Sequence, residues 1–425
     1  MEKFYSELEW RGLIHSKTRD VEKHLAEEKI TGYIGFDPTA SSLHVGSLLP
    51  IMGLVHFQRA GHSPIAIAGG GTGMIGDPSG KTQERKLLTT EEIESNLESI
   101  KKQLEPFLDF KVRANPARLI NNADWLTKLS MMEFLRDYGK HFSVNEMLAK
   151  DSVKNRIEQE QGISFTEFSY SLLQSIDYLQ VFDRFHCTIQ MGGSDQWGNI
   201  VAGADLIRRM RGAEVHALVF PLITTSSGVK FGKTESGTVW LDEERTSPYK
   251  FWQFWYNTDD QDVVKYLKYF TLLTHSEIEE LEASVRSAPQ ERRAQTKLAS
   301  EVTERLHGSS AAQKALAARD ILFGTGDIRR AGEKDLLDIF SDVPSVELAR
   351  DELSGAGTPL LDVLVASGAV KSKGDARRAI QSGGIYLNND RVTDENKKIS
   401  VSDSLHGKFF VLRRGNKNYF LVKLR

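Results

Sequence analysis

Two short motifs place residue types that could bind and activate a polyphosphate. In the first, His44-Val-Gly46-Ser47, a histidine and a glycine stand at a strand-to-helix junction. A nucleotide can approach the glycine backbone there, and the imidazole and helix N-terminus can stabilise phosphate charge. The second, Lys230-Phe-Gly-Lys233-Thr234, sets two lysines around a glycine between turn-rich segments, as in a loop that closes on a polyphosphate. Taken alone, the first motif could instead contain a histidine with a purely structural role, and the second could be a basic loop in contact with solvent.

The elements that must position these motifs follow a βαβ pattern. Apolar strand-like runs and helical patterns alternate over Thr31–Phe36 (strand), Leu43–Ala60 (helix), Pro64–Ala68 (strand), Phe165–Asp183 (helix) and Cys187–Met191 (strand). This pattern predicts an α/β fold with a mostly parallel sheet. Ligands bind beyond the carboxyl ends of strands in such sheets, so the chemistry is expected in the segments that follow Phe36, Ala68 and Met191.

One helical pattern carries a polar row. Tyr170, Gln174 and Asp177 are spaced i, i+4, i+7, so they fall on one helix face and can point together into a pocket. The alternative is a polar face in contact with solvent.

A glycine-rich stretch matches the dinucleotide fingerprint but lacks its context. Gly71-Thr-Gly73-Met-Ile-Gly76 follows a strand, as the fingerprint requires, but Asp77-Pro-Ser-Gly80 then breaks the chain where a long helix should begin. A tight glycine turn is therefore favoured over nicotinamide binding.

Composition describes an ordinary protein of 425 residues with a single cysteine, Cys187. One cysteine excludes an intrachain disulfide framework and suits a reducing compartment.

Residues 38–58 contain no Asp, Glu, Lys or Arg, but the serines, proline and histidines scattered through them argue against a membrane span. Residues 1–20 carry acidic side chains and no apolar run, unlike a signal peptide. We expect a cytoplasmic protein without a membrane contact.

Charge is unevenly distributed along the chain. Residues 355–425 hold 13 Lys and Arg against 6 Asp and Glu, whereas the remainder holds 42 against 52. A basic module on an acidic body favours a nucleic-acid contact, with a solvated basic tail as the alternative. Changes in composition along the chain predict an α/β body over 1–242, which contains a mobile loop at 228–236. A helical domain over 243–322, a linker over 323–357 and a small basic domain over 358–425 would follow.

Together the two phosphate-binding motifs resemble the HIGH and KMSKS signatures of class I aminoacyl-tRNA synthetases. Further stretches resemble the bacterial-type tyrosyl-tRNA synthetases, over almost the whole chain from about Tyr5. These stretches are Tyr33-Ile-Gly-Phe-Asp-Pro-Thr39, Gly76-Asp-Pro-Ser-Gly-Lys81, Tyr170-Ser-Leu-Leu-Gln-Ser-Ile-Asp177 and Gly192-Gly-Ser-Asp-Gln-Trp-Gly-Asn199. Ser47 departs from the signature's usual second histidine, and Thr234 from its usual serine.

The resemblance implies roles for individual residues. Tyr33 and Asp177 would hydrogen-bond the phenolic hydroxyl of tyrosine, and phenylalanine would leave both unpaired. The ammonium and carboxylate end of tyrosine would be held by Asp77, Tyr170, Gln174 and Gln196. The phosphates of ATP would contact Thr39, His44, Lys230, Lys233 and Thr234, and the nucleotide and ribose would contact Asp37, Gly46, Ser47, Gly192 and Asp195. Lys81 and Arg85 would reach the departing pyrophosphate, with a solvated basic loop as the alternative.

The resemblance also implies a fold and partners. It implies a Rossmann-like catalytic body with an inserted helical dimerisation segment at about 121–160, a helical domain that holds tRNA, and a C-terminal alpha-L RNA-binding fold. Lys371, Lys373, Arg377 and Arg378 would line an RNA backbone track there, unless they only form a solvated helix face. The implied substrates are L-tyrosine, tRNA(Tyr) and ATP with Mg²⁺, with no all-protein metal site, in a homodimer. The alternatives are a non-catalytic synthetase-derived RNA-binding protein, a tryptophanyl enzyme and, last, a nicotinamide oxidoreductase.

Overall fold

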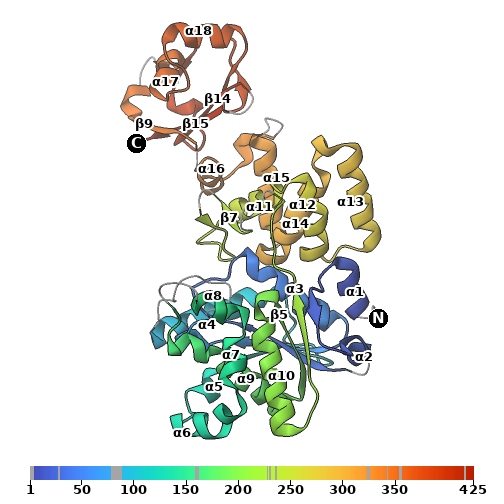
Figure 1. Cartoon of the computed structure of the whole chain (residues 1–425). Helices are drawn as coiled ribbons and strands as arrows, with labels where there is room; N and C mark the ends of the chain where they lie inside the picture. The colour runs from blue at the N-terminus through green and yellow to red at the C-terminus, as the bar shows by residue number, and fades with distance from the viewer. Residues whose placement is uncertain are drawn as a thin grey trace. The chain divides into compact units, whose positions relative to one another are not determined.

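The computed structural model describes residues 4–26, 29–77, 89–157, 162–226, 228, 231–234, 237–322, 326–341, 343–353, 357–415 and 418–425. At residues 90, 151, 152, 155, 233 and 234 it describes the backbone alone. The chain forms two compact units (Figure 1). One comprises Met1–Thr246 with Trp255–Leu298, and the other Ser247–Phe254 with Ala299–Arg425.

The first unit is built around a six-stranded sheet of order β1-β6-β5-β2-β3-β4. Its strands are β1 (Ser16–Lys17), β2 (Thr31–Phe36), β3 (Ser63–Ala68), β4 (Arg118–Asn121), β5 (Cys187–Gly193) and β6 (His216–Phe220). All neighbours pair in parallel except β1, which is antiparallel to β6. The predicted α/β class with a mostly parallel sheet is confirmed.

The strand order reverses between β2 and β5. From β2 the chain adds β3 and β4 on one side, then crosses back to place β5 and β6 on the other. In open α/β sheets such a reversal opens a crevice at the carboxyl ends of the two strands. The residues that follow β2 and β5 therefore lie together at that edge of the sheet.

Helices α3 (Leu48–Arg59), α9 (Phe165–Phe185) and α10 (Trp197–Arg211) pack against strands of this sheet, and α9 and α10 lie side by side in Figure 1. Ser164 caps the start of α9 by accepting the Glu167 N–H. The helix predicted from Leu43 begins later than expected. The backbone of Leu43 and Val45 pairs with residues 239–241, which holds it extended, and a 3₁₀ turn over Val45–Ser47 precedes α3.

A helical segment lies between β4 and α9. It contains α5 (Ala123–Leu126), α6 (Met131–Glu133), α7 (Val144–Leu148) and α8 (Asp151–Ile157). The remaining helices before it are α1 (Phe4–Arg11), α2 (Val21–Ala26) and α4 (Thr90–Leu104). No helix in the described parts of the chain is long and apolar enough to cross a membrane.

A helical region follows the sheet. It consists of α11 (Pro248–Tyr256), α12 (Asp260–Phe270), α13 (His275–Ser287), α14 (Arg293–His307) and α15 (Ser309–Leu322). Thr274 and Glu277 form a capping box at the start of α13, which satisfies two helix N–H groups reciprocally. The helical character predicted after Glu243 is confirmed.

The C-terminal part of the second unit has its own core. Helices α17 (Leu360–Ala366) and α18 (Lys373–Gln381) precede β11 (Ile385–Leu387), β14 (Phe409–Arg414) and β15 (Asn418–Leu424), with buried Leu360, Ile380 and Phe410 in one cluster. Within the stretch interpreted as a linker, the structure has α16 (Glu333–Ile339) and β9 (Ser345–Leu348). Strand β9 pairs in parallel with β15, so backbone pairing from a distant strand orders a glycine-flanked segment.

Candidate active site

A chain of buried and partly buried hydrogen bonds lies beyond the carboxyl ends of β2, β3 and β4. The Tyr170 hydroxyl donates to Oδ2 of Asp37 at 2.7 Å, and the Thr72 hydroxyl donates to Oδ1 of the same carboxylate at 2.8 Å. Asn122 donates to the Thr72 hydroxyl at 2.9 Å and to Asp177 at 2.8 Å. Asp37 follows β2, Tyr170 and Asp177 project from α9, and Asn122 follows β4. One polar network thus links α9 with the residues that follow β2, β3 and β4.

Asp177 is a buried carboxylate held by two donors. Trp125 Nε1 donates to Oδ1 at 2.7 Å, while Asn122 occupies Oδ2. Burial raises the pKa of Asp177 to about 7, and the two hydrogen bonds oppose that rise. A carboxylate with such a pKa gains from any further donor that reaches it.

Two polar atoms near this network have no hydrogen-bond partner within the described part of the chain. They are the Tyr33 hydroxyl and Oε1 of Gln174, and both are buried. Burial and the charge of Asp177 raise the pKa of Tyr33. Buried polar groups are normally paired, so unpaired ones beside a buried carboxylate are suited to a polar ligand.

A second pair lies at the ends of β3 and β5. Asp77 is buried and accepts from Nε2 of Gln196 at 2.6 Å. Gly76, just before Asp77, has φ +87°, a conformation that only glycine adopts without strain. Lys81 and Arg85, expected to reach pyrophosphate, lie outside the described residues.

The glycine run after β3 makes room for this network. A Cβ on Gly69 would lie 2.0 Å from an oxygen of Asp37, and one on Gly70 would lie 2.2 Å from an oxygen of Asn121. Only a short 3₁₀ turn, Thr72–Met74, follows the first glycines. The interpretation of a tight glycine turn, not a dinucleotide fingerprint, agrees with this geometry.

His44 is fixed by the glycine beside it. The Gly46 N–H donates to Nδ1 of His44 at 3.0 Å, so the ring proton of the neutral histidine belongs on Nε2. A Cβ on Gly46 would lie 2.7 Å from Cε1 of the ring. Nearby, Thr39 is exposed, and the Ser47 hydroxyl does not cap α3.

The structure brings together the two motifs that are predicted to bind phosphate. Gly232 has φ +80°, and a Cβ there would lie 2.7 Å from Val45. The Gly232 carbonyl accepts the Val239 N–H at 3.0 Å, and the Val239 carbonyl accepts the Val45 N–H at 3.1 Å. The backbone of Lys233–Thr234 forms β7, paired with β8 (Gly237–Thr238). Their side chains and all of Lys230 lie outside the described residues.

The other expected nucleotide contacts are Gly192, within the end of β5, and Asp195, just after it. A Cβ on Gly193 would lie 2.5 Å from an oxygen of Asp195, and one on Gly192 would lie 3.3 Å from the side chain of Gln196. Asp195 and Gln196 form a 3₁₀ turn that leads into α10. Across the described residues, no three His, Cys, Asp or Glu side chains are placed to hold a metal ion.

Sequence reasoning missed three side chains of this site: Thr72, Asn122 and Trp125. Thr72 lies within the glycine stretch, whose spacing predicts a tight turn but gives no sign of a contact with Asp37. Asn122 and Trp125 lay in the helical insertion, and their spacing gave no sign of a contact with Asp177. Only the pairing of β4 with β3 brings Asn122 to the network.

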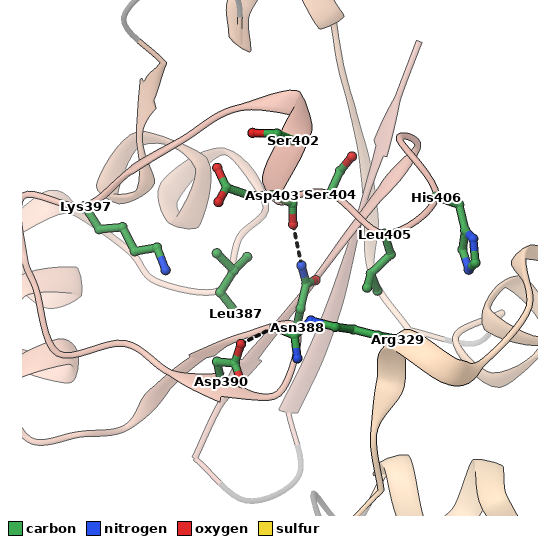
Figure 2. A pocket seen from close by; sticks show the side chains of 10 residues that line it. All are labelled: Arg329, Leu387, Asn388, Asp390, Lys397, Ser402, Asp403, Ser404, Leu405 and His406. Atoms are coloured by element: carbon green, nitrogen blue, oxygen red, sulfur yellow. Dashed lines mark hydrogen bonds and ion pairs between the residues drawn. The ribbon is translucent and has the colours of Figure 1, made fainter.

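The four basic residues expected to contact RNA lie in the C-terminal part of the second unit. Lys371 precedes α18, the other three are on it, and all four are exposed. Lys373 forms an ion pair with Asp362. Figure 2 shows a separate pocket of about 400 Å³, where Asn388 donates to the backbone of Asp403. None of the four residues lines that pocket.

Comparisons with known proteins give consistent results. Residues 25–324 match the family described as tRNA synthetases class I (W and Y), and residues 335–422 match the tyrosine–tRNA ligase SYY-like C-terminal domain. A tyrosine–tRNA ligase of Roseiflexus castenholzii is 55% identical over 418 residues, which cover 98% of either chain. One of Geobacillus kaustophilus is 51% identical over 421 residues, 98% of this chain and 99% of the relative.

A solved structure shares the fold and a substantial part of the sequence. It is a C-terminally truncated mitochondrial tyrosyl-tRNA synthetase of Aspergillus nidulans, with a TM-score of 0.69 and 32% identity. The match covers 76% of this chain and 95% of that structure.

Proposed function

The chain belongs to the tyrosine–tRNA ligase family of class I synthetases, and we propose that the polar network beyond the carboxyl ends of β2, β3 and β4 is its tyrosine site. As a ligase of this family it uses ATP to join tyrosine to tRNA(Tyr). The observation that carries the proposal is the buried Tyr33 hydroxyl, which has no hydrogen-bond partner among the described residues and whose pKa is raised by burial and by the charge of Asp177. A phenolic hydroxyl can pair with both groups, whereas a phenylalanine ring would leave both desolvated and unpaired.

The ammonium end of tyrosine would lie beside Asp77, Gln196, Tyr170 and Gln174. The buried carboxylate of Asp77 could balance the positive charge of the ammonium group. Oε1 of Gln174 has no hydrogen-bond partner among the described residues, so it could accept a hydrogen bond from that group. Both carboxylate oxygens of Asp37 accept from Tyr170 and Thr72. We therefore assign Asp37 to orienting Tyr170, in place of the nucleotide contact that the sequence suggested.

Activation would join the tyrosine carboxylate to the α-phosphate of ATP, with pyrophosphate leaving in line. Such a step needs positioning and charge stabilisation more than covalent help from the protein. Nε2 of His44 is suited to donate to a phosphate oxygen, and Gly46 and Ser47 lie beside it. Thr39, Lys81, Arg85, Lys230, Lys233 and Thr234 would supply the remaining phosphate contacts, Gly192 and Asp195 would contact the nucleotide and ribose, and Mg²⁺ would arrive with ATP.

The helical segment between β4 and α9 would form a homodimer interface. Met131 and Met132 on α6 are 74% and 71% exposed, and Leu135 one turn later is 48% exposed. Neighbouring large apolar side chains on a surface are typical of protein–protein contacts. Sedimentation of the wild type and of Met132→Glu tests this directly: a dimer that the substitution leaves intact would exclude this face.

The deciding experiment for the reaction is ATP–pyrophosphate exchange without tRNA, run with tyrosine, phenylalanine and tryptophan. We expect exchange with tyrosine alone. Exchange with tryptophan would contradict the phenol site. Folded protein without exchange for any of the three would instead indicate a synthetase-derived RNA-binding protein.

A further inference from the structure

Lys150 points its charged end into the protein. It lies between α7 and α8, and the residue as a whole is only partly buried. Its Nζ atom, however, is buried. Lysines usually bury the methylene stem and leave the ammonium in water, so the orientation here is reversed.

The Lys150 ammonium has no hydrogen-bond partner among the residues that the structure describes. It carries three donors, and a buried charge without a partner is costly. Its stem lies beside α10, because a Cβ on Gly198 would be 3.8 Å from Cδ of Lys150. Gly198 is two residues after Gln196, so this contact places the Lys150 stem near the pair that Gln196 and Asp77 form.

The charge near the Lys150 ammonium is that of Asp77. Burial lowers the pKa of Lys150 to about 8, and Asp77 opposes that fall. Asp77 also accepts the short hydrogen bond from Gln196. Asp77 is thus the charged group that acts on the buried Lys150 ammonium, and that ammonium has no hydrogen-bond partner among the described residues to satisfy its donors.

We propose that Lys150 binds the carboxylate of the substrate tyrosine while Asp77 binds its ammonium group. The inference rests on the function proposed above and names a further substrate contact within it. An α-amino acid carries its two charges on one carbon, so a buried site for it needs opposite charges side by side. In activation, one carboxylate oxygen forms the bond to the α-phosphorus as the bond to pyrophosphate breaks. The other oxygen stays hydrogen-bonded to Lys150.

The test compares tyrosine with tyramine, which keeps the phenol and the ammonium but lacks the carboxylate. Dissociation constants are measured by calorimetry for the wild type, Lys150→Met and Lys154→Met. Lys154 is exposed on α8, so its substitution removes the same charge from the same segment. We expect Lys150→Met to weaken tyrosine binding about 10- to 100-fold, as for a lost hydrogen bond to a charged group. Tyramine binding should be unchanged or tighter, and Lys154→Met should affect neither ligand.

Equal losses for tyrosine and tyramine in Lys150→Met would overturn the inference, because they would indicate a purely structural role. Lys150→Gln serves as a second variant if the thermal unfolding midpoint of Lys150→Met falls sharply. Should neither variant fold, equal affinities of the wild type for the two ligands would still contradict a carboxylate contact. A wild type that binds neither ligand would contradict the proposed tyrosine site itself.

Discussion

Asn122 donates a 2.8 Å hydrogen bond to Asp177, although 55 residues separate them in the sequence. The same amide donates to the Thr72 hydroxyl, which in turn donates to Asp37. Asp37 also accepts from Tyr170. The carboxylate proposed to recognise the phenol is thereby connected, bond by bond, to the side chains proposed for the other end of the substrate.

Asn122→Ala should weaken tyrosine binding more than ATP binding. The substitution leaves Asp177 with one donor fewer and removes the partner of Thr72, a loss of about 1–3 kcal/mol for buried polar groups. We expect KM for tyrosine in the exchange assay to rise about tenfold or more while KM for ATP changes little. Asn257→Ala, at an exposed position, is the matched control. A rise in both KM values to the same degree would argue against a local effect on Asp177.

The raised pKa of Asp177 predicts a pH dependence of tyrosine binding. Its value of about 7 means that the site is half protonated near neutrality, and the ionised form is the better acceptor for a phenol. If only that form binds, KM for tyrosine should fall about tenfold from pH 6 to pH 8. Exchange kinetics over that range measure it, and a flat profile would mean that Asp177 does not receive the phenol.

The free energy of unfolding should change with pH in the opposite direction: a rise in pH that favours tyrosine binding should lower the stability of the folded protein. The folded protein holds the Asp177 proton more tightly than the unfolded chain, whose carboxyl has a pKa near 3.8. The contribution of this proton to the stability of the folded protein is therefore complete below pH 3.8 and is lost as the pH rises to about 7. Urea unfolding at pH 5 and pH 8 should reveal this loss, and bound tyrosine should reduce it.

Gly46→Ala should slow activation without weakening tyrosine binding. The added methyl group would lie 2.7 Å from the His44 ring, so the imidazole must move away from the proposed phosphate site. Loss of one preorganised donor to a developing charge costs about 10²–10³ in rate. Gly374→Ala, on α18 with only one atom within 4 Å, at 3.9 Å, is the control. An unchanged exchange rate would remove His44 from the proposed mechanism.

A buried ion pair joins α8 to the start of α9. Arg156 donates to both carboxylate oxygens of Glu167 at 3.0 and 2.8 Å, and both side chains are almost fully buried. Glu167→Ala would leave Arg156 charged and unpaired, which should lower the free energy of unfolding by about 3–5 kcal/mol. Asp205→Ala breaks an exposed pair with Arg208 and should cost less than about 1 kcal/mol. Urea denaturation of both variants makes the comparison.

The exposed arginines of α18 allow a test of the RNA contact. Arg377→Ala combined with Arg378→Ala should weaken tRNA charging and make the salt slope of tRNA binding less steep by about one per lost phosphate contact. Exchange without tRNA should be unaffected. Unchanged charging and an unchanged salt slope would leave α18 as a solvated helix face.

Local sequence determined much of the fold. The strand at Thr31–Phe36 has the predicted ends, and the strands at Ser63–Ala68 and Cys187–Gly193 differ from prediction by at most two residues. Short apolar runs bounded by glycine and polar residues mark buried parallel strands clearly. The polar row of Tyr170, Gln174 and Asp177 on α9 also follows from helical spacing alone. The family match agrees with the resemblance read from the motifs.

Tertiary structure decided what each of those residues contacts. Nothing near Asp177 in the sequence predicts that Asn122 and Trp125 bind it, because those contacts depend on which strands pair. The start of α3 likewise depends on pairing with residues 239–241, which helical periodicity cannot register. Local sequence likewise does not predict the close approach of Gly232 to Val45 or the burial of the Lys150 ammonium. Spacing along one element fixes the direction of a side chain, but partners and burial depend on elements that the chain brings back from far away.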